Sequence, residues 1–249
     1  MNQSGRDIFA GKYREALETE ARWLRYGAVV KADSVENLVR NVGFVPATIL
    51  EVGAGTGAVI AELKARGIGR SHGALDYSGE ALDYLRRNSP GIDVIQGDVT
   101  KLPAKLSADL VVCSHVLEHL EEPGKALLGI KENITARYYL FEVPLEDLPL
   151  GRLRNGSKYR RSNSAGHVQF YNPVSFRNLI SIEYKICCER IYYPALSAEA
   201  FRFVMNVDNI SGAKRASKWM TRQVLPILLG PVWTKLWHAH MAVICTRVE

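Results

Sequence analysis

Three glycines and a carboxylate stand together at the end of a short apolar run. The segment ILEVGAGTG places Gly53, Gly55 and Gly57 directly after TILEV. Glycines at this spacing allow a tight turn and let a ligand approach the backbone closely. Glu51 lies inside the apolar run, where a buried carboxylate is costly unless it is paired. The pattern predicts either a cationic ligand or a carboxylate that fixes the amides of the loop.

The glycine spacing by itself also fits a dinucleotide-binding loop, because G-x-G-x-x-A begins at Gly53. Two features favour a cationic ligand instead. Glu51 would repel a pyrophosphate, and one acid stands at the end of each of the next two β-rich runs, Asp76 in GALDY and Asp98 in QGDV. Residues 1–150 carry 21 Asp and Glu against 17 Lys and Arg, which suits a cationic ligand.

The order E-x-G-x-G-x-G, an acid at the second strand end and then G-D resembles the class I S-adenosylmethionine-dependent methyltransferases across residues 45–145. The segment CSHVLEHLEEP, residues 113–123, looks like part of the small-molecule branch related to ubiquinone-biosynthesis methyltransferases. The segment GHVQFYNPVSFRNLI, residues 166–180, resembles the segment after the fifth strand in that branch. The resemblance implies S-adenosylmethionine as the cofactor.

The resemblance also implies a role for each matching position. The glycines would pass under the methionine part of the cofactor, and Glu51 would organise that loop and the amino group. Asp76 would accept hydrogen bonds from the ribose, while Asp98 and the Val99 amide would recognise the adenine. The two residues after the fourth strand would line the methionine side. The implied cofactor-binding residues are Glu51, Gly53, Gly55, Gly57, Asp76, Tyr77, Asp98, Val99, Ser114 and His115.

Methyl transfer is an in-line attack on a carbon that the sulfonium already activates. The protein mainly holds the reactants in line, which can supply ~7–11 kcal/mol. A hydroxyl acceptor needs a base, whereas an amine can react without one. We predict His119 and His167 as the catalytic residues, because histidine titrates near neutral pH. His115 and Glu118 are further candidates, and packing or capping roles are the structural alternative.

A basic segment follows the fifth predicted strand. Residues 151–249 carry 15 basic and 5 acidic side chains, and GRLRNGSKYRRS holds five cations and no acid. Arginine favours bidentate contacts with phosphate or carboxylate, so we predict an anionic small-molecule substrate. The alternative is a solubilising surface loop. The predicted substrate-binding residues are Arg152, Arg154, Lys158, Arg160, Arg161 and Tyr171.

Lys214, Lys218 and Arg222 recur every fourth residue, with tryptophans and leucines nearby. This pattern predicts either a helix at a membrane surface or a helix packed against the sheet. For the whole chain, a nucleic-acid methyltransferase, an NAD-dependent oxidoreductase and a non-catalytic nucleotide-fold binding protein stay open as alternatives. The basic second half favours nucleic acid, but a D/N-P-P-Y/F tetrad is absent.

Short β-rich runs alternate with helical runs, which predicts βαβ units and a parallel sheet. The expected α/β fold is Rossmann-like, with a mainly parallel seven-stranded sheet, helices on both faces, an N-terminal helical cap and a helical insertion before the last strand. The candidate residues then lie outside the carboxyl ends of the strands, where such sheets bind ligands. Strands are predicted at 48–52, 73–77, 92–96, 109–113, 138–143, 183–194 and 241–248. Helices are predicted at 14–29, 34–42, 58–65, 78–87, 124–134 and 173–179, with an inserted helical segment over 195–240.

The composition is that of an ordinary globular protein. Of 249 residues, 47% are hydrophobic and 23% charged, which excludes collagen, coiled coil and disorder for the whole. We expect one domain over 1–249, with N-terminal helices (1–45), a cofactor-binding core (46–145) and a substrate-side elaboration (146–249). Four cysteines without C-x-x-C spacing predict reduced thiols, no metal site and a cytoplasmic protein. Neither a signal peptide nor a membrane-spanning run is expected.

Overall fold

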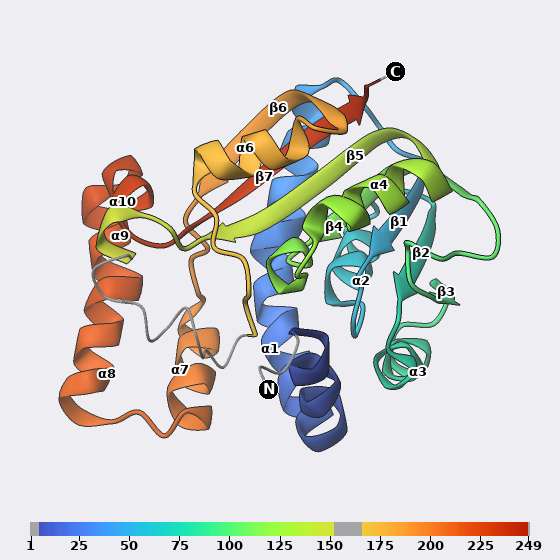
Figure 1. The fold of residues 1–249 in the computed structure, drawn as a ribbon. Coiled ribbons are helices and arrows are strands. Elements are labelled where there is room, and N and C mark those ends of the chain that lie inside the picture. The colour runs from blue at the N-terminus through green and yellow to red at the C-terminus, as the bar shows by residue number, and fades with distance from the viewer. Residues whose placement is uncertain (1–4, 152–165, 249) are drawn as a thin grey trace.

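A mainly parallel sheet forms the centre of the molecule, with helices on both of its faces (Figure 1). The computed structural model describes residues 5–151 and 166–248. Within these ranges the sheet has seven strands in the order β3-β2-β1-β4-β5-β7-β6, and β7 alone runs antiparallel to its neighbours. The predicted fold class is therefore confirmed. The strands are β1 (Thr48–Val52), β2 (Ser71–Asp76), β3 (Asp93–Gln96), β4 (Leu106–Ser114), β5 (Ile134–Leu145), β6 (Tyr184–Tyr192) and β7 (Ala239–Arg247).

The central strands are apolar runs because both faces of the sheet are covered. Residues 49–52 of β1 and residues 110–114 of β4 are all buried. The strand order reverses between β1 and β4, which are parallel neighbours joined through β2 and β3. In open α/β sheets a ligand binds at such a reversal, outside the carboxyl ends of the strands. The topology thus places the glycine loop after β1 where a ligand is expected.

The helices divide between the two faces of the sheet. One apolar cluster, which includes Leu38, Leu63 and Leu85, joins α1, α2 and α3 to one face. A second cluster, which includes Leu127 and Phe176, joins α4 and α6 to the other face. The bounds of these helices are α1 (Gly5–Asn41), α2 (Ala58–Ala65), α3 (Gly79–Asn88), α4 (Pro123–Asn133) and α6 (Pro173–Ile180).

The N-terminal segment corrects one prediction. The sequence suggests two helices, with Asp33 or Ser34 as the N-cap of the second, but α1 continues through both residues. Its non-helical residue is Ala16 instead, with φ −146° and ψ 37°. Ser34 is fully buried, and the buried residues Ala28, Ala32 and Val35 continue one stripe at helical spacing on both sides of it. Burial of that stripe prevails over the preference of serine for a helix start.

Two other predicted helix starts are confirmed by their caps. The Ser78 hydroxyl accepts a hydrogen bond from the Ala81 amide, at the start of α3. Asn172 closes a reciprocal capping box at the start of α6, and Pro173 takes the first helical position. Caps of these types satisfy amides that have no partner inside the helix. They therefore fix where the loops after β2 and before α6 end.

The predicted helical insertion lies between β6 and β7, at the left of Figure 1. It buries Trp233, yet Ile227 is 81% exposed and Leu228 is 71% exposed. Core packing therefore accounts for only part of its apolar residues. Within the described residues, no helix is long and apolar enough to cross a membrane. The elements of the insertion are α7 (Ala198–Val207), α8 (Gly212–Trp219), a π-helical turn η2 (Met220–Val224), α9 (Leu225–Leu229) and α10 (Pro231–Leu236).

Candidate functional site

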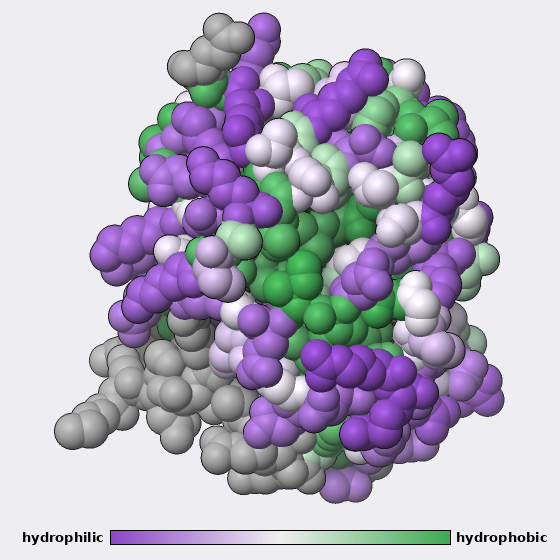
Figure 2. Space-filling view, turned by 90° about the vertical axis from the view of Figure 1, so that its right-hand side faces the viewer, coloured by the Kyte–Doolittle hydropathy of each residue, from purple (hydrophilic) through white to green (hydrophobic). Residues whose placement is uncertain are grey.

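A cavity of about 460 Å³ lies at the carboxyl ends of β1, β2 and β4. Nine of the ten predicted cofactor-binding residues line it, and the exception is Gly57. The helix α1 also contributes lining residues, among them Trp23 and Lys31, which the sequence did not single out. Figure 2 shows the side of the molecule on which β3 and α3 lie, where apolar residues gather in a hollow with a hydrophilic rim.

The glycine loop has the conformation that only glycine adopts without strain. Gly53, Gly55 and Gly57 have φ of 72°, 53° and 72°, all in the left-handed region. A Cβ on Gly53 would stand 2.3 Å from Val116 Cγ2, and a Cβ on Gly57 would stand 2.3 Å from Leu85 Cδ1. Gly53 thus lines the cavity with bare backbone, whereas Gly57 permits close packing against α3.

Two buried carboxylates hold this loop and the start of the helix that follows it. Asp76 Oδ2 accepts from the Gly55 amide at 2.7 Å, and Asp76 Oδ1 accepts from the Ser78 amide at 2.8 Å. Glu51 Oε2 accepts from the Ile60 amide at 3.0 Å, near the start of α2. A carboxylate oxygen can accept more than one hydrogen bond, so both groups keep acceptor capacity toward the cavity that they line.

Glu51 makes the stability of the cofactor-free protein depend on pH. Burial raises the pKa of Glu51 to about 8, against the opposing effects of the Ile60 amide and Lys31. The folded state then binds one more proton than the unfolded state between pH about 4.5 and 8, so this group stabilises the fold at low pH and the contribution is lost as pH rises through 8. Glu51→Gln removes the titrating group and keeps an acceptor for Ile60.

From pH 6 to pH 8, we expect the free energy of unfolding of Glu51→Gln to rise by about 2 kcal/mol relative to that of the parent protein. The slope is about 1.36 kcal/mol per pH unit. Urea unfolding at both pH values measures this difference. Glu132→Gln, on an exposed position of α4, is the control and should show no such change. An equal gain for Glu51→Gln at both pH values would contradict the argument.

The chain turns sharply where β4 ends. Ser114 is buried, and its hydroxyl lies 3.3 Å from Glu142 Oε2. His115 has φ 58°, and its amide donates to the Glu142 carbonyl at 2.9 Å. A left-handed conformation at a non-glycine residue costs of order 1–3 kcal/mol and is often found at functional sites. The turn directs both Ser114 and His115 to the cavity, as the sequence predicts.

Glu142, on β5, is the centre of a buried polar network that the sequence did not reveal. Its carboxylate accepts from the Tyr192 hydroxyl and lies 3.3 Å from His240 Nδ1. His115 Nε2 lies 3.2 Å from the same His240 nitrogen. Burial opposes ionisation of Glu142, but the two histidines hold its pKa well below the usual range. Burial lowers the pKa of His240 to about 4.

His119 and His167 lie together at the cavity. Their ring centroids are 4.9 Å apart, although one follows β4 in the short helix η1 (Leu117–His119) and the other precedes α6. His119 Nδ1 lies 3.1 Å from the Gly166 carbonyl oxygen, and His167 Nδ1 lies 2.6 Å from Glu146 Oε2. Burial lowers the pKa of His119 to about 4, so this ring is neutral near pH 7 and can accept a proton.

Glu118 lies between these histidines and His115. Its side chain is fully buried. Burial alone would raise its pKa, but the neighbouring histidines, His115 foremost, lower the pKa of Glu118 to about 2. Glu118 is therefore a charged group in the interior, which is unusual unless a cation or a strong donor accompanies it.

The side of the cavity assigned to adenine is formed by the turn after β3. Asp98 Oδ1 accepts from the Thr100 amide at 2.9 Å and from its hydroxyl at 2.8 Å. This local bonding fixes the turn, and Asp98, Val99 and Tyr77 all line the cavity. The placement agrees with the predicted positions, while the contact to adenine stays a prediction.

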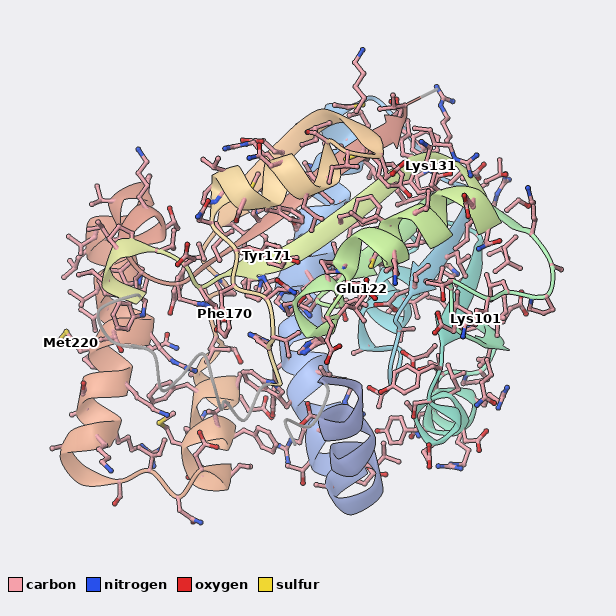
Figure 3. All side chains as sticks on the ribbon, viewed as in Figure 1. Lys101, Glu122, Lys131, Phe170, Tyr171 and Met220 are labelled. Atoms are coloured by element: carbon pink, nitrogen blue, oxygen red, sulfur yellow. The ribbon has the colours of Figure 1, made fainter. Side chains whose placement is uncertain are left out.

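Two predictions for the substrate side have different outcomes. The five cations Arg152, Arg154, Lys158, Arg160 and Arg161 lie outside the described residues. Tyr171 does not line the cavity as described, because its ring packs with Phe176 in the core and its hydroxyl faces the Leu117 carbonyl at 3.4 Å. Figure 3 shows it in the interior, between α6 and α4. We therefore correct its role from a substrate contact to a packing residue behind η1.

Comparisons with known proteins agree with this geometry. Residues 50–133 match the family model described as methyltransferase domain. The demethylmenaquinone methyltransferase of Renibacterium salmoninarum is 41% identical over 92 residues, which is 36% of this chain and 38% of that protein. The match thus spans about two fifths of the length of this curated relative.

Solved structures share the fold over most of the chain. An S-adenosylmethionine-dependent methyltransferase of Thermotoga maritima superposes with a TM-score of 0.58 and 15% identity, over 95% of this chain and 98% of that one. The N-methyltransferase NodS of Bradyrhizobium japonicum, in complex with S-adenosylhomocysteine, has a TM-score of 0.51 and 12% identity, over 86% and 85% of the two chains. The predicted resemblance is confirmed where the comparisons reach: residues 50–133 match a methyltransferase domain, and the chain as a whole shares the fold of these solved methyltransferases.

Proposed function

We propose that this protein transfers a methyl group from S-adenosylmethionine to an oxygen or nitrogen of a small, anionic metabolite. The methyl carbon leaves the sulfonium for the acceptor, the acceptor loses a proton, and S-adenosylhomocysteine is released. The observation that carries the proposal is the cavity wall of glycine backbone held by Asp76 and Glu51, inside the methyltransferase domain. That match favours methyl transfer over the dinucleotide alternative.

The cofactor would lie along the carboxyl edge of the sheet. The methionine part would rest on the loop of Gly53 and Gly55, where no side chain intervenes. The ribose hydroxyls would donate to Asp76, and the adenine would reach the turn of Asp98 and Val99. S-adenosylhomocysteine in the solved NodS structure supports this choice of cofactor, because it is the product of S-adenosylmethionine after methyl transfer.

The acceptor would approach from the side of His119 and His167. Both rings line the cavity, and the segment of His119 directly follows β4, where the transferable methyl group is expected. Holding the acceptor in line can lower the barrier by ~7–11 kcal/mol. For a hydroxyl acceptor, His119 or His167 would take the proton.

A negative charge on the acceptor molecule is supported by the cations of the second half. Within the described residues, Lys31 and Arg222 line the cavity. The basic segment with Arg160 and Arg161 follows β5 in the sequence. Charge-assisted contacts of this kind hold phosphate or carboxylate groups well.

The proposed function is tested by a thermal-shift screen of metabolites with saturating cofactor, followed by mass spectrometry for the gain of one methyl group. We expect acceptors that carry phosphate or carboxylate. Their KM should rise in about 0.5 M salt, which screens exposed charges. KM should also rise in the double variant Arg160→Ala/Arg161→Ala, but not in Arg86→Ala/Arg87→Ala, a matched pair on α3. An uncharged acceptor, or KM values that neither salt nor the first variant changes, would contradict the anionic substrate.

We also propose that the helical insertion between β6 and β7 contacts a membrane surface. The stripe of Lys214, Lys218 and Arg222 accompanies the exposed side chains of Ile227 and Leu228. Figure 3 shows Met220 at the outer edge of this insertion, pointing away from the sheet. Basic and apolar residues together favour an anionic lipid surface. Co-sedimentation with anionic vesicles measures the contact, and equal sedimentation of Ile227→Asp/Leu228→Asp would argue against it.

A further inference from the structure

Glu118 is a buried carboxylate without a well-formed hydrogen bond. Both of its oxygens are inaccessible and have no hydrogen-bond partner among the described residues. His115 Nδ1 stands 3.2 Å from Glu118 Oε1 as an ion-pair contact. The Glu118 backbone is fixed, because its carbonyl accepts from the amides of Val168 and Gln169 at 2.8 and 3.0 Å. A rigid, buried carboxylate of this kind indicates a place for a cation.

Two histidines complete a three-residue cluster with Glu118. One potential ligand atom from each of Glu118, His119 and His167 lies within 4.8 Å of the other two. His119 Nε2 is 3.9 Å from Glu118 Oε1. The distances suit side chains that converge on one ion after a small adjustment, since metal–ligand bonds of about 2.0–2.2 Å separate two ligand atoms by roughly 3–4 Å.

The other nitrogen of each histidine is held in the way that metal ligands require. His119 Nδ1 can donate to the Gly166 carbonyl, and His167 Nδ1 can donate to the Glu146 carboxylate. Donation from Nδ1 places the lone pair of each ring on Nε2, which is the ligating form. Histidine ligands commonly donate their second N–H to a carboxylate or backbone carbonyl, which fixes the ring and strengthens the ligand.

We propose that Glu118, His119 and His167 bind a divalent transition-metal ion of the zinc type. Two imidazoles and one carboxylate are a ligand set of catalytic zinc sites, which keep a further position open. Both histidines line the cavity, so the open position would face it. The role of the ion rests on the proposed function: it would supply Lewis acidity to an acceptor oxygen, and the histidines would then act as ligands in place of a base.

The described residues contain a second cluster with suitable atoms, formed by His115, Glu142 and His240. Its carboxylate is already satisfied, because Glu142 accepts from Tyr192 and is within reach of Ser114 and His240. An ion there would have to displace these hydrogen bonds. The Glu118 cluster is therefore the better site, and the second cluster provides a control.

The full chain, stripped of metal with a chelator, is titrated with Zn²⁺ by calorimetry and with Co²⁺ by visible absorption. We expect one ion per chain. Glu118→Gln and His167→Ala should each weaken binding at least tenfold, and the positioning variant Glu146→Gln should weaken it about 10–100-fold. His240→Ala should bind as the parent protein does. Circular dichroism identifies any variant that fails to fold. If Glu118→Gln does not fold, the binding measured for His167→Ala decides the result.

Stoichiometry below one ion, or unchanged affinity in folded Glu118→Gln or His167→Ala, would overturn the site. Loss of metal binding in His240→Ala alone would place the metal site at the second cluster, and this result would equally refute the proposal. A parallel titration with S-adenosylhomocysteine separates the two proposals. Metal binding without S-adenosylhomocysteine binding contradicts the proposed function and leaves the metal site standing, whereas the reverse result refutes the metal site alone.

Discussion

Alanine at His119 or at His167 is expected to lower kcat by about 10²–10⁴, the usual contribution of a positioned proton acceptor, and kcat should also fall if the lost ring is a ligand of the proposed ion. Both rings line the cavity and lie 4.9 Å apart, so each can approach an acceptor held there. The affinity for S-adenosylhomocysteine should change little, because the loop that would hold it is fixed by Asp76 from β2 and the helix after that loop by Glu51 from β1. Steady-state kinetics and calorimetry on each variant measure the two quantities separately.

His72→Ala is the matched control for these substitutions. His72 is also a buried histidine, but it lies in β2 and its Nε2 is within 2.8 Å of the Ile68 carbonyl, remote from the cavity lining. We expect its kcat to match the parent protein. Full activity in both His119→Ala and His167→Ala would mean that the transfer needs neither ring, and an amine acceptor would then be favoured over a hydroxyl.

The part of the fold that the sequence predicts well is the part set by local patterns. Residues 48–52 and 58–65 form a strand and a helix at the predicted bounds, because an apolar run meets a glycine cluster that requires positive φ. Ser78 and Asn172 start helices because their side chains bond amides two or three residues away. All of these determinants are local in the chain.

Long-range partners explain what the sequence did not show. Glu142 stands in the apolar run YYLFEV, and its partners Tyr192 and His240 are 50 and 98 residues away. The signal was present, since an acid inside an apolar strand needs a partner just as Glu51 does. Tyr171 forms a parallel bridge with Leu145 outside any helix, and this long-range contact is not indicated by the residues next to Tyr171 in the chain.

Asp76→Ala is expected to weaken S-adenosylhomocysteine binding by about 10–150-fold, which corresponds to 1.5–3 kcal/mol for hydrogen bonds to a charged group. The substitution removes the acceptor proposed for the ribose. It also leaves the Gly55 and Ser78 amides without the oxygens that now bind them at 2.7 and 2.8 Å. Calorimetry with S-adenosylhomocysteine and with S-adenosylmethionine measures the loss.

The conservative variant separates these two effects of Asp76. Asp76→Asn keeps one oxygen for an amide but has no negative charge, so we expect an affinity between those of the parent protein and Asp76→Ala. Asp93→Ala, at the exposed start of β3, is the control and should bind normally. The glycine spacing also fits a dinucleotide-binding loop, and that alternative predicts the opposite result. Such a loop would bind NADH tightly and would not bind S-adenosylhomocysteine. That result would refute the cofactor assignment, because a pyrophosphate would then be tolerated beside the buried Glu51.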